Sequence, residues 1–221
     1  LFPYTTLFRS VADSLDYAVS GAVQKNYDVI GFDPRGVGAS SAVVCVDSAA
    51  DMDEFLFGAS ETVRASPEWF AEREAASTDF ARGCLERTGD LLAHVDTVSA
   101  AHDLDMLRAT VGDRQLNYLG YSYGTLLGAI YAENFPGNVG RMVLDGALDP
   151  SSSSFDVNLT QSIGFENALR AYLADCLAGS ECPFAGTVDS AMTQIGQLLA
   201  ELDQSPLTAS DGRVLGADAM L

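Results

Sequence analysis

Residues 120–124, Gly-Tyr-Ser-Tyr-Gly, decide the fold of this 221-residue chain. An apolar run at residues 116–119 precedes them, and an apolar helical pattern at residues 126–131 follows them. In the order strand, tight turn, helix, the pattern G-x-S-x-G is typical of a nucleophile elbow, which holds a serine hydroxyl above the end of a sheet. Side chains two positions either side of the serine would collide, so we expect both Gly120 and Gly124 to be required. The pattern predicts Ser122 as a catalytic nucleophile, against the alternative of an ordinary glycine-rich turn.

Strand and helix patterns alternate on both sides of this turn, which indicates an α/β fold with a parallel sheet and crossover helices. After Pro150 the pattern changes to a polar linker at residues 151–154 and then to helices. Asp211-Gly212 marks a turn near the end of the chain. The expected strands are 27–32, 116–119 and 141–145. The expected helices are 11–25, 66–84, 97–111 (with residue 99 as the alternative start), 126–135, 159–177 and 187–202.

The composition excludes several classes of protein. Hydrophobic residues make up 48% of the chain and charged residues 19%, which is typical of a globular protein. There are 12 Lys and Arg against 31 Asp and Glu, a net charge of −19. Binding to nucleic acid requires clustered cations, so we expect no nucleic-acid partner. No apolar run reaches 18 residues, so we expect no membrane span.

The first ten residues, LFPYTTLFRS, differ in character from the rest. They resemble the translation of a common sequencing-adapter primer, and we interpret residues 1–10 as a non-native segment. We expect residues 11–150 to form the N-terminal part of the α/β core. Residues 151–221 are expected to begin a helical lid.

Four stretches, read together, carry a resemblance to a known family. The chain resembles the secreted bacterial tripeptidyl aminopeptidases, relatives of proline iminopeptidase in the α/β-hydrolase superfamily. The resemblance extends over essentially everything from Val11 onward. The stretches are YDVIGFDPRGVGAS (27–40), DLDMLRATVGDRQLNYLGYSYGT (103–125), YAENFPGNVGRMVLDGALDPS (131–151) and ENALRAYLADCLAGSECPF (166–184).

The resemblance implies a Ser–Asp–His hydrolase that removes tripeptides from peptides with a free N-terminus, without a cofactor. It also implies a glycine-rich oxyanion-hole segment where residues 1–10 stand, so we expect the second oxyanion donor before residue 11. The only histidines, His94 and His102, precede Ser122. The fold places its acid and its histidine after the serine, so both are expected beyond residue 221. We therefore expect a fold truncated at both ends, and an inactive fragment.

Other candidate residues surround the predicted nucleophile. The backbone N–H of Tyr123 is expected to face the oxyanion of the tetrahedral intermediate. Asp33 and Arg35, in the turn after residues 27–32, are expected to brace loops beside the site by hydrogen bonding, with direct contact to substrate as the alternative.

The acidic residues leave two roles open. Asp145 and Asp149 are alternative candidates for the triad acid, against a structural role in a turn. Recognition of a substrate α-amine needs a carboxylate, for which Glu166 and Asp175 are candidates that the sequence does not separate.

The four cysteines can pair in three ways. The short spacing favours a disulfide between Cys176 and Cys182, which leaves Cys45 to pair with Cys84. Two disulfides indicate an oxidising, exported setting, either secreted or in the cell envelope; the alternative is four buried thiols. There is no Cys-x-x-Cys pair and no suitably spaced histidine, so we expect no metal site.

The sequence therefore predicts a serine exopeptidase. A serine esterase or lipase-like hydrolase on the same fold is the first alternative, and a non-catalytic binding protein that keeps the fold is the second. The P1 preference and the oligomeric state are left open.

Overall fold

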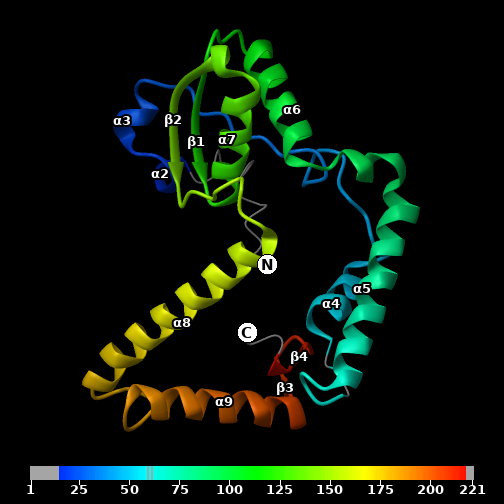
Figure 1. The fold of residues 1–221 in the computed structure, drawn as a ribbon, viewed down its shortest axis with the longest axis vertical. Coiled ribbons are helices and arrows are strands. Elements are labelled where there is room, and N and C mark those ends of the chain that lie inside the picture. The colour runs from blue at the N-terminus through cyan, green and yellow to red at the C-terminus, as the bar shows by residue number, and fades with distance from the viewer. Residues whose placement is uncertain (1–14, 59, 61, 218–221) are drawn as a thin grey trace. The chain divides into compact units, whose positions relative to one another are not determined.

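The computed structural model describes residues 15–58, 60 and 62–217 (Figure 1). The chain divides into two compact units. One comprises residues 1–45 and 82–150, and the other comprises residues 46–81 and 151–221. Each unit is described by itself below, the first as the elbow unit and the second as the helical unit. Residues 1–10, which we interpret from the sequence as a non-native segment, lie outside the described residues.

In its described part, the elbow unit contains two strands, β1 (Leu116–Tyr121) and β2 (Val139–Asp145). They pair in parallel, with Gly120 opposite Leu144 and Tyr121 opposite Asp145. Because parallel neighbours need a crossover, the chain between them forms α7 (Tyr123–Asn134) and the short η3 (Pro136–Asn138). Helix α7 lies against the two strands, and α6 (Thr97–Thr110) lies beside α7 (Figure 1). The α/β fold class is confirmed.

The core of the elbow unit lies between α6, α7 and the sheet. Leu127 and Tyr131 of α7 are fully buried, and Ala100, Ala101 and Leu104 of α6 meet them. Val111, by contrast, is 45% exposed. It lies one residue past the end of α6, where the helical period no longer directs it to the core.

A charged cluster joins α6, α7 and η3. The Asp105 carboxylate accepts hydrogen bonds from Tyr131 Oη at 2.9 Å, from Asn138 Nδ2 at 2.8 Å and from Arg108 Nε at 2.8 Å. The bond to Arg108, followed by those to Tyr131 and Asn138, lowers the pKa of Asp105 to about 2 despite its partial desolvation. Burial, together with the bond to Asp105, raises the pKa of Tyr131 to about 12, so its hydroxyl remains a donor at neutral pH.

Two expectations for the first forty residues are wrong. Residues 27–32 form no strand, and Ile30 is 53% exposed. A strand exists only through its ladder, and neither described strand of this unit pairs with this run; it contributes Phe32 to the core instead. Of the helix expected over residues 11–25, residues 11–14 lie outside the described residues, and the rest contains two short helices, α2 (Leu15–Ala18) and α3 (Gly21–Gln24). Ser20 between them has an extended backbone, which ends the helical path.

Helix α5 (Pro67–Thr88) passes from one unit into the other and is followed by η2 (Gly89–His94). Its start is as the sequence predicts, since the Trp69 N–H donates to Ser66 Oγ at 3.1 Å and Pro67 occupies the first turn. The cap of α6 is Asp96, one residue before the expected start, and its carboxylate accepts from the Ser99 N–H at 2.8 Å.

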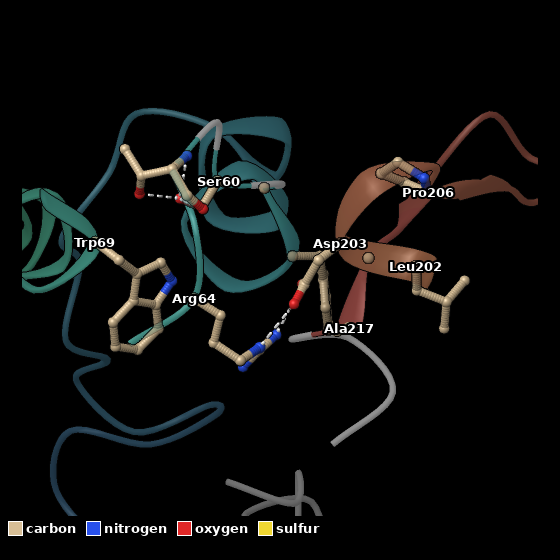
Figure 2. Close-up of a pocket in the computed structure, with 11 residues that line it drawn as sticks. Ser60, Arg64, Trp69, Leu202, Asp203, Pro206 and Ala217 are labelled. Carbon is tan, nitrogen blue, oxygen red and sulfur yellow. Dashed lines mark hydrogen bonds and ion pairs between the residues drawn. The ribbon is translucent and has the colours of Figure 1, made fainter. Parts of the chain in front are cut away.

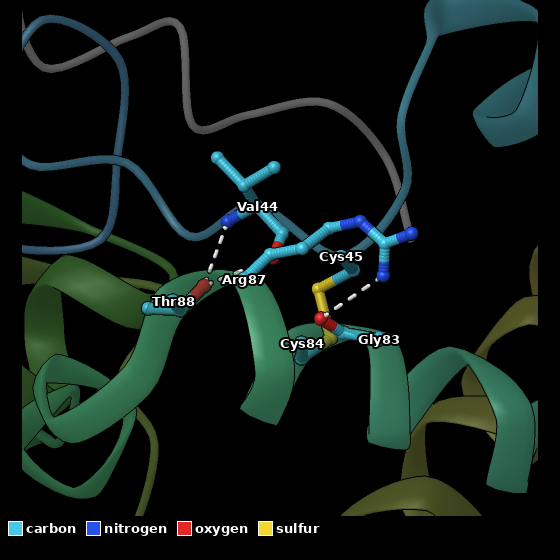
Figure 3. The surroundings of a disulfide bond; sticks show 6 residues. All are labelled: Val44, Cys45, Gly83, Cys84, Arg87 and Thr88. Atoms are coloured by element: carbon cyan, nitrogen blue, oxygen red, sulfur yellow. Dashed lines mark hydrogen bonds between the residues drawn. A yellow bond between two sulfur atoms is a disulfide. The ribbon is translucent and has the colours of Figure 1, made fainter.

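A covalent and hydrogen-bonded clamp holds residues 44–45 against α5 (Figure 3). Cys45 and Cys84 form a disulfide across 39 residues. Thr88 Oγ1 accepts from the Val44 N–H and donates to the Val44 carbonyl, each at 2.9 Å. Any Cβ on Gly83 would collide with the Cys45 carbonyl oxygen, so the close approach requires glycine there.

The helical unit contains α4 (Ala49–Phe57), α8 (Ser154–Ala178), α9 (Val188–Gln204) and a small antiparallel pair, β3 (Leu207–Thr208) and β4 (Val214–Leu215). Ser48, Ser153 and Thr187 cap its helices with side-chain oxygens. Helix α8 begins five residues earlier than expected, because Ser153 acts as its cap rather than as linker. Helix α4 was not predicted.

Within the helical unit, a disulfide between Cys176 and Cys182 closes the turn after α8. Leu173 of α8 and Ala191 of α9 are fully buried. The Phe55 and Phe80 rings stack at a centroid distance of 4.0 Å. None of the described helices has both the length and the hydropathy that crossing a bilayer demands. The assignment of residues 11–150 to a core and 151–221 to a lid stays a prediction.

Candidate active site

Ser122 occupies a strained turn at the carboxyl end of β1. Its backbone has φ 50° and ψ −118°, a conformation that a non-glycine residue seldom adopts. The Ser122 N–H donates to the Asp145 carbonyl at 3.0 Å, which extends the β1–β2 ladder by one residue, and α7 begins at the next residue. Ser122 is exposed, and its hydroxyl has no hydrogen-bond partner among the residues that the structure describes.

The two elbow glycines are required to different degrees. A Cβ on Gly120 would lie 2.5 Å from the Gly124 carbonyl oxygen and 2.6 Å from Tyr118 Cε1. A Cβ on Gly124 would meet only Tyr118 Oη, at 3.3 Å. The steric argument for glycine is therefore strong at Gly120 and weak at Gly124, where the neighbouring atom would have to shift by only about 0.1 Å to reach an ordinary contact. The difference arises because the Gly124 carbonyl and the Tyr118 ring both lie close to Gly120, whereas only the Tyr118 hydroxyl lies near Gly124.

Thr125 fastens the turn from within. It is 1% exposed, and its hydroxyl donates to the Ser122 carbonyl at 2.6 Å. The same oxygen accepts from the Leu148 N–H at 3.0 Å, in the loop after β2. The turn that carries Ser122 is thus tied to the last residue of β2 and to the loop that follows it. A buried threonine three residues after the serine was the only available sequence signal, and it was missed.

Tyr123 is the first residue of α7. The first N–H groups of a helix have no intrahelical acceptor, and the helix dipole adds partial positive charge there. The Tyr123 side chain is directed elsewhere, with its hydroxyl 3.1 Å from Thr97 Oγ1. The geometry leaves the backbone N–H beside Ser122 as a donor for a developing negative charge.

Asp33 and Arg35 each make bracing contacts inside the elbow unit. Asp33 Oδ2 accepts from the Ala39 N–H at 2.8 Å, which closes the glycine-rich turn on itself. Arg35 binds Asp103 of α6 with two parallel bonds of 2.7 Å, from Nε and from Nη2. Its Nη1 also donates to the His94 carbonyl at 3.1 Å. The sequence anticipated bracing by these residues but did not identify Asp103.

The histidines are placed at other parts of the unit. The His102 ring lies edge-on to Phe135, with centroids 5.0 Å apart. Phe135 follows the last turn of α7, about 20 Å along the helix axis from Ser122 at 1.5 Å per residue. His94 is exposed at the end of η2, where its backbone carbonyl serves Arg35.

The candidate carboxylates differ in their surroundings. Asp145 is the last residue of β2 and is exposed, and its backbone carbonyl accepts a hydrogen bond from the Ser122 N–H. Glu166 on α8 accepts from Arg170 Nε at 2.8 Å, and Arg170 also donates to Asp189 of α9 at 2.8 Å. Glu166 is therefore already paired with a cation, which it shares with Asp189. Asp175 is exposed on the same helix.

The helical unit contains a small hollow that none of these candidate residues lines (Figure 2). Its enclosed space is about 10 Å³, roughly what one water molecule needs. Trp69 lines one side, and Arg64 and Asp203 form an ion pair of 3.2 Å across it. Such a small hollow accommodates no peptide. Among the described residues, no group of three or more His, Cys, Asp or Glu side chains is arranged to hold a metal ion.

Comparison with known proteins places these features in context. The profile of the alpha/beta hydrolase fold family matches residues 6–188. The chain is 44% identical over 162 residues to Serine protease Hip1 of Mycobacterium tuberculosis H37Rv, with 73% of this chain and 31% of that protein covered. It is 43% identical over 171 residues to Tripeptidyl aminopeptidase of Streptomyces lividans, with 76% and 31% covered.

A third relative carries a different activity in its name. The chain is 38% identical over 199 residues to Carboxylesterase B of Mycobacterium tuberculosis CDC 1551, with 89% of this chain and 38% of that protein covered. The chain thus spans about a third of the length of the curated relatives it matches.

Proposed function

Because this chain belongs to the α/β-hydrolase fold family, we propose that Ser122 is the nucleophile of a serine hydrolase. The backbone of Ser122 is the single observation that carries the proposal. A non-glycine residue at φ 50° costs about 1–3 kcal/mol and persists only where its surroundings fix it. Here β1, α7 and Thr125 fix it with the hydroxyl exposed. That arrangement is useful for attack on a substrate and has no packing role.

The reaction follows from the chemistry of serine. The Oγ atom bonds to the carbonyl carbon of the substrate while its proton passes to a base. The negative charge that develops on the carbonyl oxygen is stabilised by the Tyr123 N–H; loss of one such donor typically costs about 10²–10³ in turnover. The bond to the leaving amine or alcohol then breaks as that group takes the proton. Water hydrolyses the acyl-enzyme and restores Ser122.

The base and the acid are proposed to lie outside these 221 residues. His102 is fixed against Phe135 at the far end of α7, and His94 precedes the serine in a fold whose order is serine, acid, histidine. Asp145 and Asp149 remain the alternatives for the acid. A second oxyanion donor is also proposed to come from another segment.

The substrate is proposed to be a peptide with a free N-terminus, from which a tripeptide is released. Support comes from the relative named Tripeptidyl aminopeptidase and from the relative named as a serine protease. An esterase is the second candidate, favoured by the relative named Carboxylesterase B. The two disulfides support an exported protein, secreted or in the cell envelope, since such bonds persist in oxidising compartments. Residues 11–150 are proposed as core and 151–221 as part of a lid.

Two measurements test this proposal. The product of the complete gene is expected to react with a fluorophosphonate at Ser122, and the Ser122→Ala variant is expected not to react. The 221-residue chain alone is expected to react far more slowly. Comparison of kcat/KM for a tripeptidyl amide and for short acyl esters separates the peptidase from the esterase. Labelling that is undiminished in Ser122→Ala would refute the assignment of the nucleophile.

A further inference from the structure

Tyr118 lies in a slot that three glycines form. Tyr118 and Gly120 are two residues apart on β1 and therefore face the same side of the sheet. On the opposing helix, Gly124 and Gly128 are one turn apart and share a face. A Cβ on Gly128 would lie 2.8 Å from Tyr118 Cε1, and a Cβ on Gly120 would lie 2.6 Å from the same atom. The ring thus fills the space that the absent side chains leave.

The hydroxyl of Tyr118 crosses the turn. It donates to the Gly124 carbonyl at 2.7 Å, so a strand residue is bonded to the first turn of α7. Desolvation raises the pKa of this phenol, and the group remains a donor under all ordinary conditions. The two arms of the turn, β1 before Ser122 and α7 after it, are therefore joined by one side chain as well as by the backbone.

This contact acts on the residue that is strained. A turn at φ 50° relaxes when either arm is free to rotate, and such relaxation moves the hydroxyl that the turn presents. Displacement of a reacting atom by 1 Å costs about 10²-fold in rate. A bond that fixes the angle between strand and helix therefore serves the reaction without touching the substrate.

We propose that Tyr118 is a positioning residue for the nucleophile: its ring fills the slot of Gly120, Gly124 and Gly128, and its bond to the Gly124 carbonyl holds Ser122 in place. The inference rests on the proposed function, in which Ser122 attacks the substrate. It concerns a residue that contacts neither substrate nor reacting atoms.

The test is Tyr118→Phe, which removes the hydroxyl and keeps the ring, in the product of the complete gene. Tyr131→Phe is the matched control, because it also removes a hydroxyl from a phenol in this unit, on the face of α7 toward Asp105. Tyr118→Phe is expected to lower kcat and the rate of fluorophosphonate labelling about tenfold, with KM changed less than twofold. Tyr131→Phe is expected to leave all three within twofold at temperatures where it stays folded. Equal kcat values for the two variants would overturn the proposal.

A second readout does not depend on activity. Amide exchange is measured at Ser122, bonded to the Asp145 carbonyl, and at Thr125, bonded to the Ser122 carbonyl. Tyr118→Phe is expected to accelerate these two amides about tenfold relative to the amides of α6, and Tyr131→Phe is expected not to. A wild-type protein that neither labels nor hydrolyses refutes the proposed function; the exchange result then decides on Tyr118 alone. Uniform acceleration throughout the unit would reduce Tyr118 to an ordinary stabilising contact and overturn the inference.

Discussion

Replacement of the elbow glycines by alanine, one at a time, measures how tightly the turn is built. A Cβ on Gly120 forces the Gly124 carbonyl oxygen to retreat by about 0.9 Å to reach an ordinary contact of 3.4 Å, and two of its three nearest atoms belong to backbone. Overpacking typically costs about 1–3 kcal/mol, and a rigid neighbour places Gly120→Ala at the upper end, about 3 kcal/mol.

The same change at Gly124 has almost no steric cost. Tyr118 Oη would have to move by only about 0.1 Å to reach an ordinary contact with the new Cβ. Within a helix, alanine is up to about 1 kcal/mol more favourable than glycine. We expect Gly124→Ala to change the free energy of unfolding by less than about 0.5 kcal/mol. Gly128→Ala is an intermediate case at about 1 kcal/mol, since the atoms it meets, Leu144 Cδ2 and Tyr118 Cε1, belong to side chains that can shift.

The assay is urea unfolding of the three variants, read by amide protection of residues 116–134 so that the elbow unit alone is followed. An unchanged slope against urea concentration is required for the comparison of midpoints. The reasoning fails if Gly120→Ala and Gly124→Ala unfold at the same urea concentration. It also fails if Gly124→Ala is the less stable of the two, because the distances give the opposite order.

Four further predictions follow from the structure. The free energy of unfolding of Ser122→Gly, measured in urea, is expected to exceed that of Ser122→Ala by about 1 kcal/mol, because glycine adopts a positive φ without strain. Arg35→Lys keeps the charge but loses the paired bonds to Asp103. Its free energy of unfolding in urea is expected to fall by about 1 kcal/mol, whereas Lys25→Arg is expected to leave this free energy unchanged. Cys45→Ser with Cys84→Ser is expected to destabilise by about 4 kcal/mol and Cys176→Ser with Cys182→Ser by about 2 kcal/mol, since the loops close across 39 and 6 residues; equal losses would contradict this. The pKa of Asp105 is about 2 in the folded protein, below its unfolded value of about 3.8, so ionisation of Asp105 stabilises the fold above pH 4. This stabilisation, at most about 2 kcal/mol, is lost as the pH falls toward 2. In an acid titration of stability, Asp105→Asn is expected to lack this loss.

The elements that sequence predicted well are those whose causes are local. The start of α5 is marked by Ser66-Pro67, the start of α9 by Thr187, and the elbow by glycine spacing around Ser122. Each depends on residues within a few positions, so periodicity and capping residues are sufficient. The Ser151–Ser154 run was read as linker because nothing in it distinguishes a spacer from a cap.

The features that sequence missed depend on residues far apart in the chain. Residues 27–32 have strand composition, but a strand needs a neighbour to pair with, and composition does not supply the neighbour. Asp105 looks like any helical carboxylate until the crossing of α6 and α7 brings Tyr131 and Asn138 to it. The unequal roles of Gly120 and Gly124 likewise depend on how closely the first turn of α7 and the Tyr118 ring approach Gly120.

The bond from the Ser122 N–H to the Asp145 carbonyl separates nucleophilic attack from oxyanion stabilisation within the proposed catalytic turn. In proteases of the chymotrypsin type, the attacking serine lends its own amide to the charged intermediate. Here the Ser122 amide is bonded to the sheet. In the proposed reaction Ser122 therefore supplies the attacking Oγ, and the Tyr123 N–H supplies the bond to the oxyanion. In the proposed site, replacement of Ser122 by another nucleophile would therefore leave the oxyanion donor of Tyr123 in place.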